Sequence, residues 1–151
     1  MQKLVILITA AMLCCACNSS EKKTKEPIKI GQNKTASNNQ TVLEKSIERG
    51  AVIYDDFCKQ CHLPNGKGVP NNFPPLAGSN WLTEKRTESI HSVKYGQRGE
   101  IVVNGVTYNG IMTPMGLTDA EVADVLNYVM NSWGNTQEKM VTEEEVAAVE
   151  K

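Results

Sequence analysis

The chain has 151 residues, of which 22% are charged and 40% hydrophobic, and its formal net charge at pH 7 is −1. This length allows one domain once the two ends are set aside. The near-neutral charge, without a basic run interleaved with aromatic residues, argues against a nucleic-acid-binding protein. Each of the five cysteines has a place in one of two short motifs, so none is left over for a disulfide.

Residues 1–16 have the order of an export signal. Lys3 supplies a positive start, residues 4–13 form an apolar stretch, and small residues then lead to Cys17. Such a stretch is typical of a signal peptide and is too short to span a bilayer comfortably. The segment resembles a bacterial lipoprotein signal, for which Cys17 is the best lipidation site and Cys15 the alternative. A plain cleaved signal with a soluble product is the competing interpretation.

Residues 17–40 are expected to be the acylated cysteine followed by a disordered tether. They are rich in Asn, Ser, Lys and Thr and have few apolar side chains, so they cannot bury enough surface to offset their ordering entropy. Residues 18–40 hold five lysines against two glutamates, whereas residues 41–151 hold ten basic and fifteen acidic side chains. The folded part, predicted as a domain over 41–136 with a tail over 137–151, is therefore expected to be mildly acidic.

A first helix is predicted to begin at Thr41, whose hydroxyl can cap it while the Glu44 side chain reaches back. A face of apolar and small residues then runs towards Cys58: Leu43, Ile47, Gly50, Ala51 and Tyr54. Glycine inside a helix costs ~1 kcal/mol relative to alanine, so Gly50 predicts that another helix approaches closely there.

The helix leads into Cys58-Lys59-Gln60-Cys61-His62. Two thiols three positions apart, followed by an imidazole, form the spacing that attaches a c-type haem. On a helical turn the two sulfurs face the same way, while His62 is carried under the porphyrin to ligate its iron. A redox-active dithiol would need a βαβ surround and a structural zinc site a second ligand pair, and the sequence supplies neither.

Beyond this motif, residues 64–76 are rich in Pro, Gly and Asn and predict a long loop. Loops of this length are usually functional or disordered, and Phe73 and Leu76 favour a functional loop that covers one porphyrin face. We expect the carbonyl of Pro74, or else of Pro75, to accept a hydrogen bond from Nδ1 of the motif histidine and to fix its tautomer.

Two smaller elements follow. Residues 82–95 predict a short helix closed by Gly96. His91 within it is expected to be a solvated helix residue, because no ligand motif surrounds it. Residues 101–108 are two β-prone runs about an Asn-Gly pair and predict a small hairpin.

Two methionines, Met112 and Met115, lie in a loop bounded by Gly and Pro. A thioether opposite the histidine would raise the haem potential and close the iron to small molecules. Met112 is preferred as this ligand, because Met115 lies three residues before the next helix cap and has less chain with which to reach the iron.

The last strong helix is predicted to start at Thr118, with Glu121 completing its capping box. Its buried stripe is expected to run until Gly134 and to comprise Val122, Val125, Leu126, Val129 and Trp133. Tyr128, beside this stripe, is expected to pack on Gly50 of the first helix. Residues 142–151 predict a short surface helix of low consequence.

Across residues 46–135 the chain resembles a class I monohaem cytochrome c. The matching positions are Gly50, Tyr54, Cys58, Cys61, His62, Pro74-Pro75-Leu76, Met112 and Tyr128. The resemblance implies an all-α fold with three to five helices around one covalent haem c, with Pro74 and Leu76 in the wall under the haem and His62 and Met112 on the iron. In the family the distal methionine is usually followed by proline, whereas here Thr113 intervenes.

The resemblance further implies an electron carrier rather than an enzyme. It would sit on the periplasmic side of a bacterial membrane, anchored by lipid, and exchange electrons with an oxidase, reductase or dehydrogenase. The alternatives are a haem enzyme, such as a peroxidase or small reductase, and a haem-based sensor. Both need an open distal site.

Overall fold

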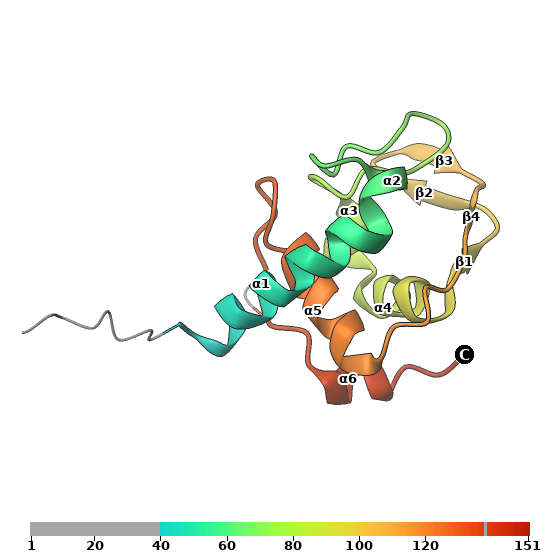
Figure 1. Cartoon of the computed structure of the whole chain (residues 1–151). Coiled ribbons are helices and arrows are strands. Elements are labelled where there is room, and N and C mark those ends of the chain that lie inside the picture. Colours follow the sequence, from blue (N-terminus) through green and yellow to red (C-terminus); the bar gives the residue numbers. More distant parts are fainter. Residues whose placement is uncertain (1–39, 138) are drawn as a thin grey trace, which may run out of the picture. The chain divides into compact units, whose positions relative to one another are not determined.

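The structure, a computed structural model, describes residues 40–137 and 139–151 (Figure 1). The expected signal peptide, the lipidation site at Cys17 and nearly all of the tether lie outside these residues. Within the described part of the chain, no helix is both long and apolar enough to cross a membrane.

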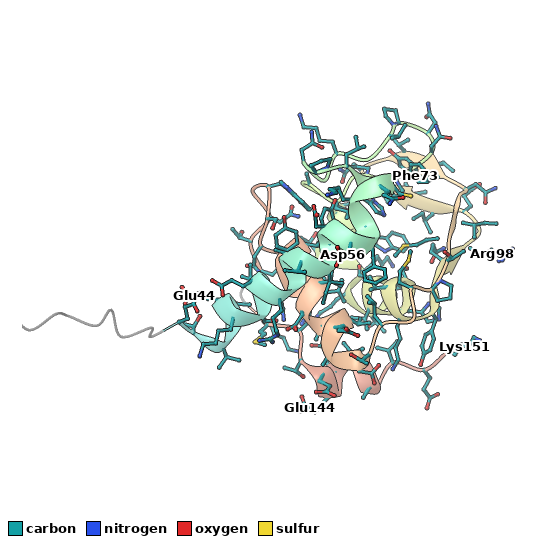
Figure 2. The ribbon with its side chains drawn as sticks, in the orientation of Figure 1. Glu44, Asp56, Phe73, Arg98, Glu144 and Lys151 are labelled. Atoms are coloured by element: carbon teal, nitrogen blue, oxygen red, sulfur yellow. The ribbon has the colours of Figure 1, made fainter. Side chains whose placement is uncertain are left out.

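The first helix, α1 (Val42–Ile53), begins where its cap predicts. The Thr41 hydroxyl accepts from the Glu44 amide at 3.1 Å, and the Glu44 carboxylate accepts from the Thr41 amide at 2.7 Å. Glu44 lies at the start of this helix, as Glu144 lies in the first turn of α6 (Glu143–Ala147) (Figure 2). Carboxylates at these positions face the positive end of the helix dipole, which stabilises each helix start.

The helix then widens into a π-helical turn, η1 (Tyr54–Cys58), before it tightens again in α2 (Lys59–His62). The sequence did not predict this widening. Single π-helical turns are frequent at functional sites, and this one ends on the first thiol of the cysteine motif.

The crossing of α1 with α5 (Asp119–Val129) is the central helix contact (Figure 1). A Cβ on Gly50 would overlap the Asp124 carbonyl and lie 2.8 Å from Cβ of Tyr128, so only glycine permits this approach. The Asp124 carboxylate also accepts from the Ser46 hydroxyl at 2.6 Å and from Arg49 Nε at 2.6 Å. The predicted packing of Tyr128 on Gly50 is confirmed.

Two helices replace the single one predicted over residues 82–95. They are α3 (Asn80–Glu84) and α4 (Arg86–Tyr95), separated at Lys85, whose backbone leaves the helical region at φ −123° and ψ 54°. Gly96 ends α4, as predicted. The predicted end at Gly96 is therefore right, whereas the prediction of one continuous helix is wrong.

The predicted hairpin is present as β2 (Ile101–Val103) paired antiparallel with β3 (Val106–Tyr108). Its turn residues, Asn104 and Gly105, both have positive φ, as a tight hairpin turn of this length requires. A second pair, β1 (Gln97–Arg98) with β4 (Ile111–Met112), was not predicted. Met112 therefore lies in a short strand opposite Gln97 rather than in an unpaired loop.

The core gathers around α5, and two predictions about the end of the chain are wrong. The helix ends at Val129, so Trp133 lies outside it with φ at 53°. Val141 and Val146 are fully buried in the same core, so the helix expected on the surface, α6, is a packed element. The fully or nearly fully buried apolar residues include Tyr54, Leu82, Ile90, Val122, Val125, Leu126, Val129 and Met130.

An ion pair and hydrogen bonds from charged side chains join the C-terminal segment, residues 140–151, to α4. Arg86 binds Glu145 through two hydrogen bonds of 2.6 and 2.8 Å, and it also donates to the Met140 carbonyl at 3.2 Å. Lys94 Nζ donates to the Val146 carbonyl at 2.9 Å. The Arg86 guanidinium lowers the pKa of Glu145 below its usual range.

We predict that Glu145→Gln lowers stability by about 1 to 2 kcal/mol at neutral pH, because both partners are only 21% and 24% exposed. A carboxylate with a depressed pKa stabilises the fold above its ordinary pKa, and this contribution is lost as the pH falls through the lowered value. Melting of the haem-loaded protein between pH 7 and pH 3 should therefore show the deficit of the variant shrinking in acid. The exposed neighbour Glu150→Gln is the control, and a deficit independent of pH would contradict the ionic account.

Candidate cofactor site

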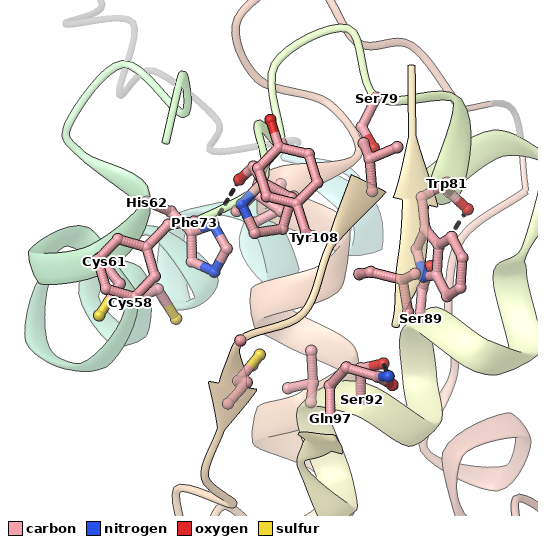
Figure 3. Close-up of a pocket in the computed structure, with 18 of the residues that line it drawn as sticks. Cys58, Cys61, His62, Phe73, Ser79, Trp81, Ser89, Ser92, Gln97 and Tyr108 are labelled. Carbon is pink, nitrogen blue, oxygen red and sulfur yellow. Dashed lines mark hydrogen bonds between the residues drawn. The ribbon is translucent and has the colours of Figure 1, made fainter. Parts of the chain in front are cut away.

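The cysteine motif occupies the end of η1 and all of α2, at the wall of a large pocket (Figure 3). Cys58 and Cys61 both line this pocket, form no disulfide, and their sulfurs point the same way. Burial, with the second thiol nearby, raises the pKa of Cys58 to about 11. The two sulfurs thus lie on one side of the motif, as a pair that adds to one planar group needs to do.

His62 is buried, and a single hydrogen bond sets its orientation. Nδ1 lies 3.0 Å from the Pro74 carbonyl, so Nδ1 carries the proton and donates it (Figure 3). This is the contact expected from the sequence, and it leaves the lone pair of Nε2 free for a metal ion. Burial lowers the pKa of His62, against the opposing effect of the Pro74 bond, so the ring is neutral and able to ligate.

The pocket encloses about 1260 Å³ of space between protein atoms, counted out to its solvent-open side. Apolar side chains form most of the wall, including Phe57, Phe73, Pro74, Pro75, Leu76, Leu82, Val93, Ile101, Val103, Val125, Leu126 and Val129. The residues present fit an iron porphyrin.

Met112 and Met115 both reach the wall of this pocket. Met112 is placed by the pairing of β4 with β1, and Met115 by the loop that precedes the Thr118 cap. The structure therefore brings a thioether, the soft ligand predicted from the sequence, to the same pocket as His62.

The loop over residues 64–76 folds back on the cysteine motif. The Gly68 amide donates to the His62 carbonyl at 3.0 Å, and the Leu76 amide donates to the Gly66 carbonyl at 2.7 Å. These bonds bring the segment from Phe73 to Leu76 onto the pocket wall, as the functional interpretation of this loop predicted.

Sequence reasoning missed two polar residues of the pocket, Ser79 and Tyr108. They are 4% and 6% exposed, and neither side chain forms a hydrogen bond with another residue of the described chain (Figure 3). Their hydroxyls are not used by the described chain, so both can donate to polar groups of a bound ligand. Tyr108 ends the predicted hairpin, but a single hydroxyl carries no motif that could have indicated its role.

His91, in contrast, lies apart from the site. It is half-buried on α4, does not line the pocket, and packs edge-on against Tyr95 at 5.2 Å between ring centroids. Within residues 40–137 and 139–151, no three His, Cys, Asp or Glu side chains gather in a way that could hold a metal ion.

A helical fold with a thiol pair and a neutral imidazole on an apolar pocket defines a c-type haem protein. A family model described as cytochrome c matches residues 47–133. The chain belongs to the cytochrome c family, which confirms the predicted fold class. Its cofactor is a covalently bound haem c, for which Cys58 and Cys61 fit the attachment motif, and its role is that of an electron carrier.

Relatives of two kinds share this domain. Cytochrome c-552 of Thermus thermophilus is 42% identical over 106 residues, which cover 64% of this chain and 80% of that protein. The cytochrome c subunit of a quinone-type alcohol dehydrogenase from Gluconacetobacter polyoxogenes is 33% identical over 101 residues, or 64% of this chain and 21% of the subunit. The fructose dehydrogenase cytochrome subunit of Gluconobacter japonicus is 28% identical over 112 residues, or 70% of this chain and 22% of the subunit.

We predict that a Cys58→Ala/Cys61→Ala variant lacks covalent haem and loses its cooperative melt. The reason is that the pocket wall is otherwise exposed, whereas burying several hundred Å² of porphyrin contributes on the order of 10 kcal/mol by area, an upper bound. Haem staining after denaturing electrophoresis and thermal melting measure the two effects. The exposed Lys67→Ala is the control, and a native-like melt of the haem-free double variant would contradict the prediction.

Proposed function

We propose that this chain is a membrane-anchored electron carrier on the periplasmic side of a bacterial membrane, with one haem c between His62 and Met112. The observation that carries the proposal is the hydrogen bond of the buried, neutral His62 to Pro74, which leaves Nε2 free for the iron. When bound, the haem supplies a one-electron couple.

The chain's own residues orient the haem and shield it from water. The thiols of Cys58 and Cys61 hold it at one edge, and Phe73 and Leu76 stand in the apolar wall. Ser79 and Tyr108 are suited to donate to the haem carboxylates, because both line the pocket and their hydroxyls have no other partner in the described chain. When the haem fills this pocket, an electron carrier needs no further space for a substrate. This favours a carrier over a peroxidase or a sensor.

Met112 is the better candidate for the second iron ligand. Its backbone is fixed by the antiparallel pairing with Gln97, whereas Met115 lies outside the named strands and helices. A ligand on a fixed backbone loses less conformational entropy when it binds the metal.

Exposed apolar residues at the rim of the pocket favour docking of a partner there. Phe57 is 45% and Ile111 58% exposed, and both also line the pocket. Exposed apolar side chains at the rim of a site favour its use as a protein interaction surface. The dehydrogenase subunits among the relatives support a redox partner of the oxidase, reductase or dehydrogenase class.

We predict that Met112→Ala abolishes the methionine-to-iron charge-transfer band of the ferric protein and opens the iron to cyanide and carbon monoxide. Met115→Ala, the matched control in the same segment, should keep the band because it removes only a wall contact. Absorption spectra of the two purified holoproteins decide between them. Loss of the band in Met115→Ala alone would reverse the assignment, and a high-spin ferric spectrum of the wild type would favour the enzyme or sensor.

Anchoring through Cys17 has its own test. We predict that Cys17→Ala moves the haem protein from the membrane fraction to the soluble fraction, whereas Cys15→Ala leaves it on the membrane. The reason is that acyl chains contribute ~0.8 kcal/mol for each buried methylene. Mass spectrometry of the mature N-terminus gives the modification directly, and an unmodified N-terminus in a soluble protein would contradict the anchor.

A further inference from the structure

The turn that follows His62 packs against a cluster of three aromatic side chains, Tyr54, Tyr128 and Trp133. Their ring centroids lie 5.0 to 5.5 Å apart. Two of the rings also bind the turn. The Tyr54 hydroxyl donates to the Leu63 carbonyl at 2.7 Å, and Trp133 Nε1 donates to the Pro64 carbonyl at 3.1 Å.

Backbone strain occurs on both sides of this contact. Leu63 has φ at 65° and Trp133 has φ at 53°, in the left-handed region that bulky residues rarely adopt. Such conformations persist only where the surrounding contacts impose them, and they concentrate at functional sites. The two strained residues are joined by the hydrogen bonds and ring contacts of the aromatic cluster.

This turn also supports the segment that carries the Pro74 carbonyl. Gly66 lies so close to the Trp133 ring that a Cβ there would overlap it. The Gly66 carbonyl accepts from the amides of Leu76 and Ala77 at 2.7 and 2.9 Å, two and three residues after Pro74 in the chain. A continuous series of contacts therefore runs from Trp133 through the turn to the carbonyl that binds His62.

We propose that Tyr54 and Trp133 are positioning residues that set the strength of the His62–Pro74 hydrogen bond and, through it, the reduction potential of the haem. The inference rests on the proposed role of His62 as an iron ligand. A strong bond from Nδ1–H increases the basicity of Nε2 and so stabilises ferric iron. Loosening the turn weakens this bond and shifts the equilibrium towards ferrous iron.

The test compares three variants of the full-length holoprotein. Tyr54→Phe and Trp133→Phe each remove one hydrogen-bond donor to the turn and keep an aromatic ring. Tyr128→Phe is the matched control, because it removes a hydroxyl from the same cluster that makes no hydrogen bond to the turn. The readouts are the midpoint potential and the ferric absorption and paramagnetic NMR spectra, in which the signals of the axial histidine report on its hydrogen bond.

We expect both test variants to shift the ferric-to-ferrous equilibrium at least threefold towards ferrous iron, ~28 mV at 59 mV per tenfold for one electron. Tyr128→Phe should keep the wild-type potential. Because Trp133→Phe also removes ring volume, Tyr54→Phe decides the result if the Trp133 variant fails to fold.

Wild-type potentials in all variants, with only lowered melting temperatures, would show that the cluster merely packs and would overturn the inference. Failure of the proposed function looks different. In that case the wild type itself would lack a low-spin, histidine-ligated spectrum, and the inference would fall with the ligation on which it rests.

Discussion

The hydrogen bond between His62 Nδ1 and the Pro74 carbonyl is the contact on which the site depends. It joins two segments with different local structure, the helical turn that carries the thiols and the loop that forms the pocket wall. This bond fixes the tautomer and orientation of the imidazole, while the Gly68–His62 and Leu76–Gly66 backbone bonds hold the wall beside the cysteine motif. The widened turn of η1, the left-handed Leu63 and the folded loop are all arranged around this bond.

The rest of the fold supports that arrangement at a distance. The glycine contact at Gly50 lets α1 cross α5 closely, and the Asp124 carboxylate locks the crossing through Ser46 and Arg49. Since α1 continues directly into the cysteine motif, this crossing also fixes where the motif begins. The C-terminal segment also packs against α5, and Arg86 and Lys94 tie it to α4.

Local signals in the sequence predicted the elements that depend on neighbouring residues. The capping boxes at Thr41 and Thr118 and the Asn-Gly hairpin were correct because a few adjacent side chains decide them. The cysteine motif and the Pro74 contact were also predictable, because the chemistry of haem attachment constrains both spacing and partner.

Features decided by distant contacts were not predictable. The β1–β4 pair has only two residues on each strand, too few for a pattern, and the break at Lys85 occurs without glycine or proline. Burial of Val146 depends on a packing surface built by other helices, so its short segment looked like a surface helix. Ser79 and Tyr108 were not predictable because only the fold places them in the pocket wall.

The most direct test of the account is the ferric absorption spectrum of the mature protein, recorded together with its intact mass. The account predicts one haem bound through two thioethers, a low-spin spectrum, and a methionine-to-iron band that persists when cyanide or carbon monoxide is offered. A high-spin spectrum with rapid ligand binding would contradict the carrier, and a mass showing both thiols free would contradict the site itself.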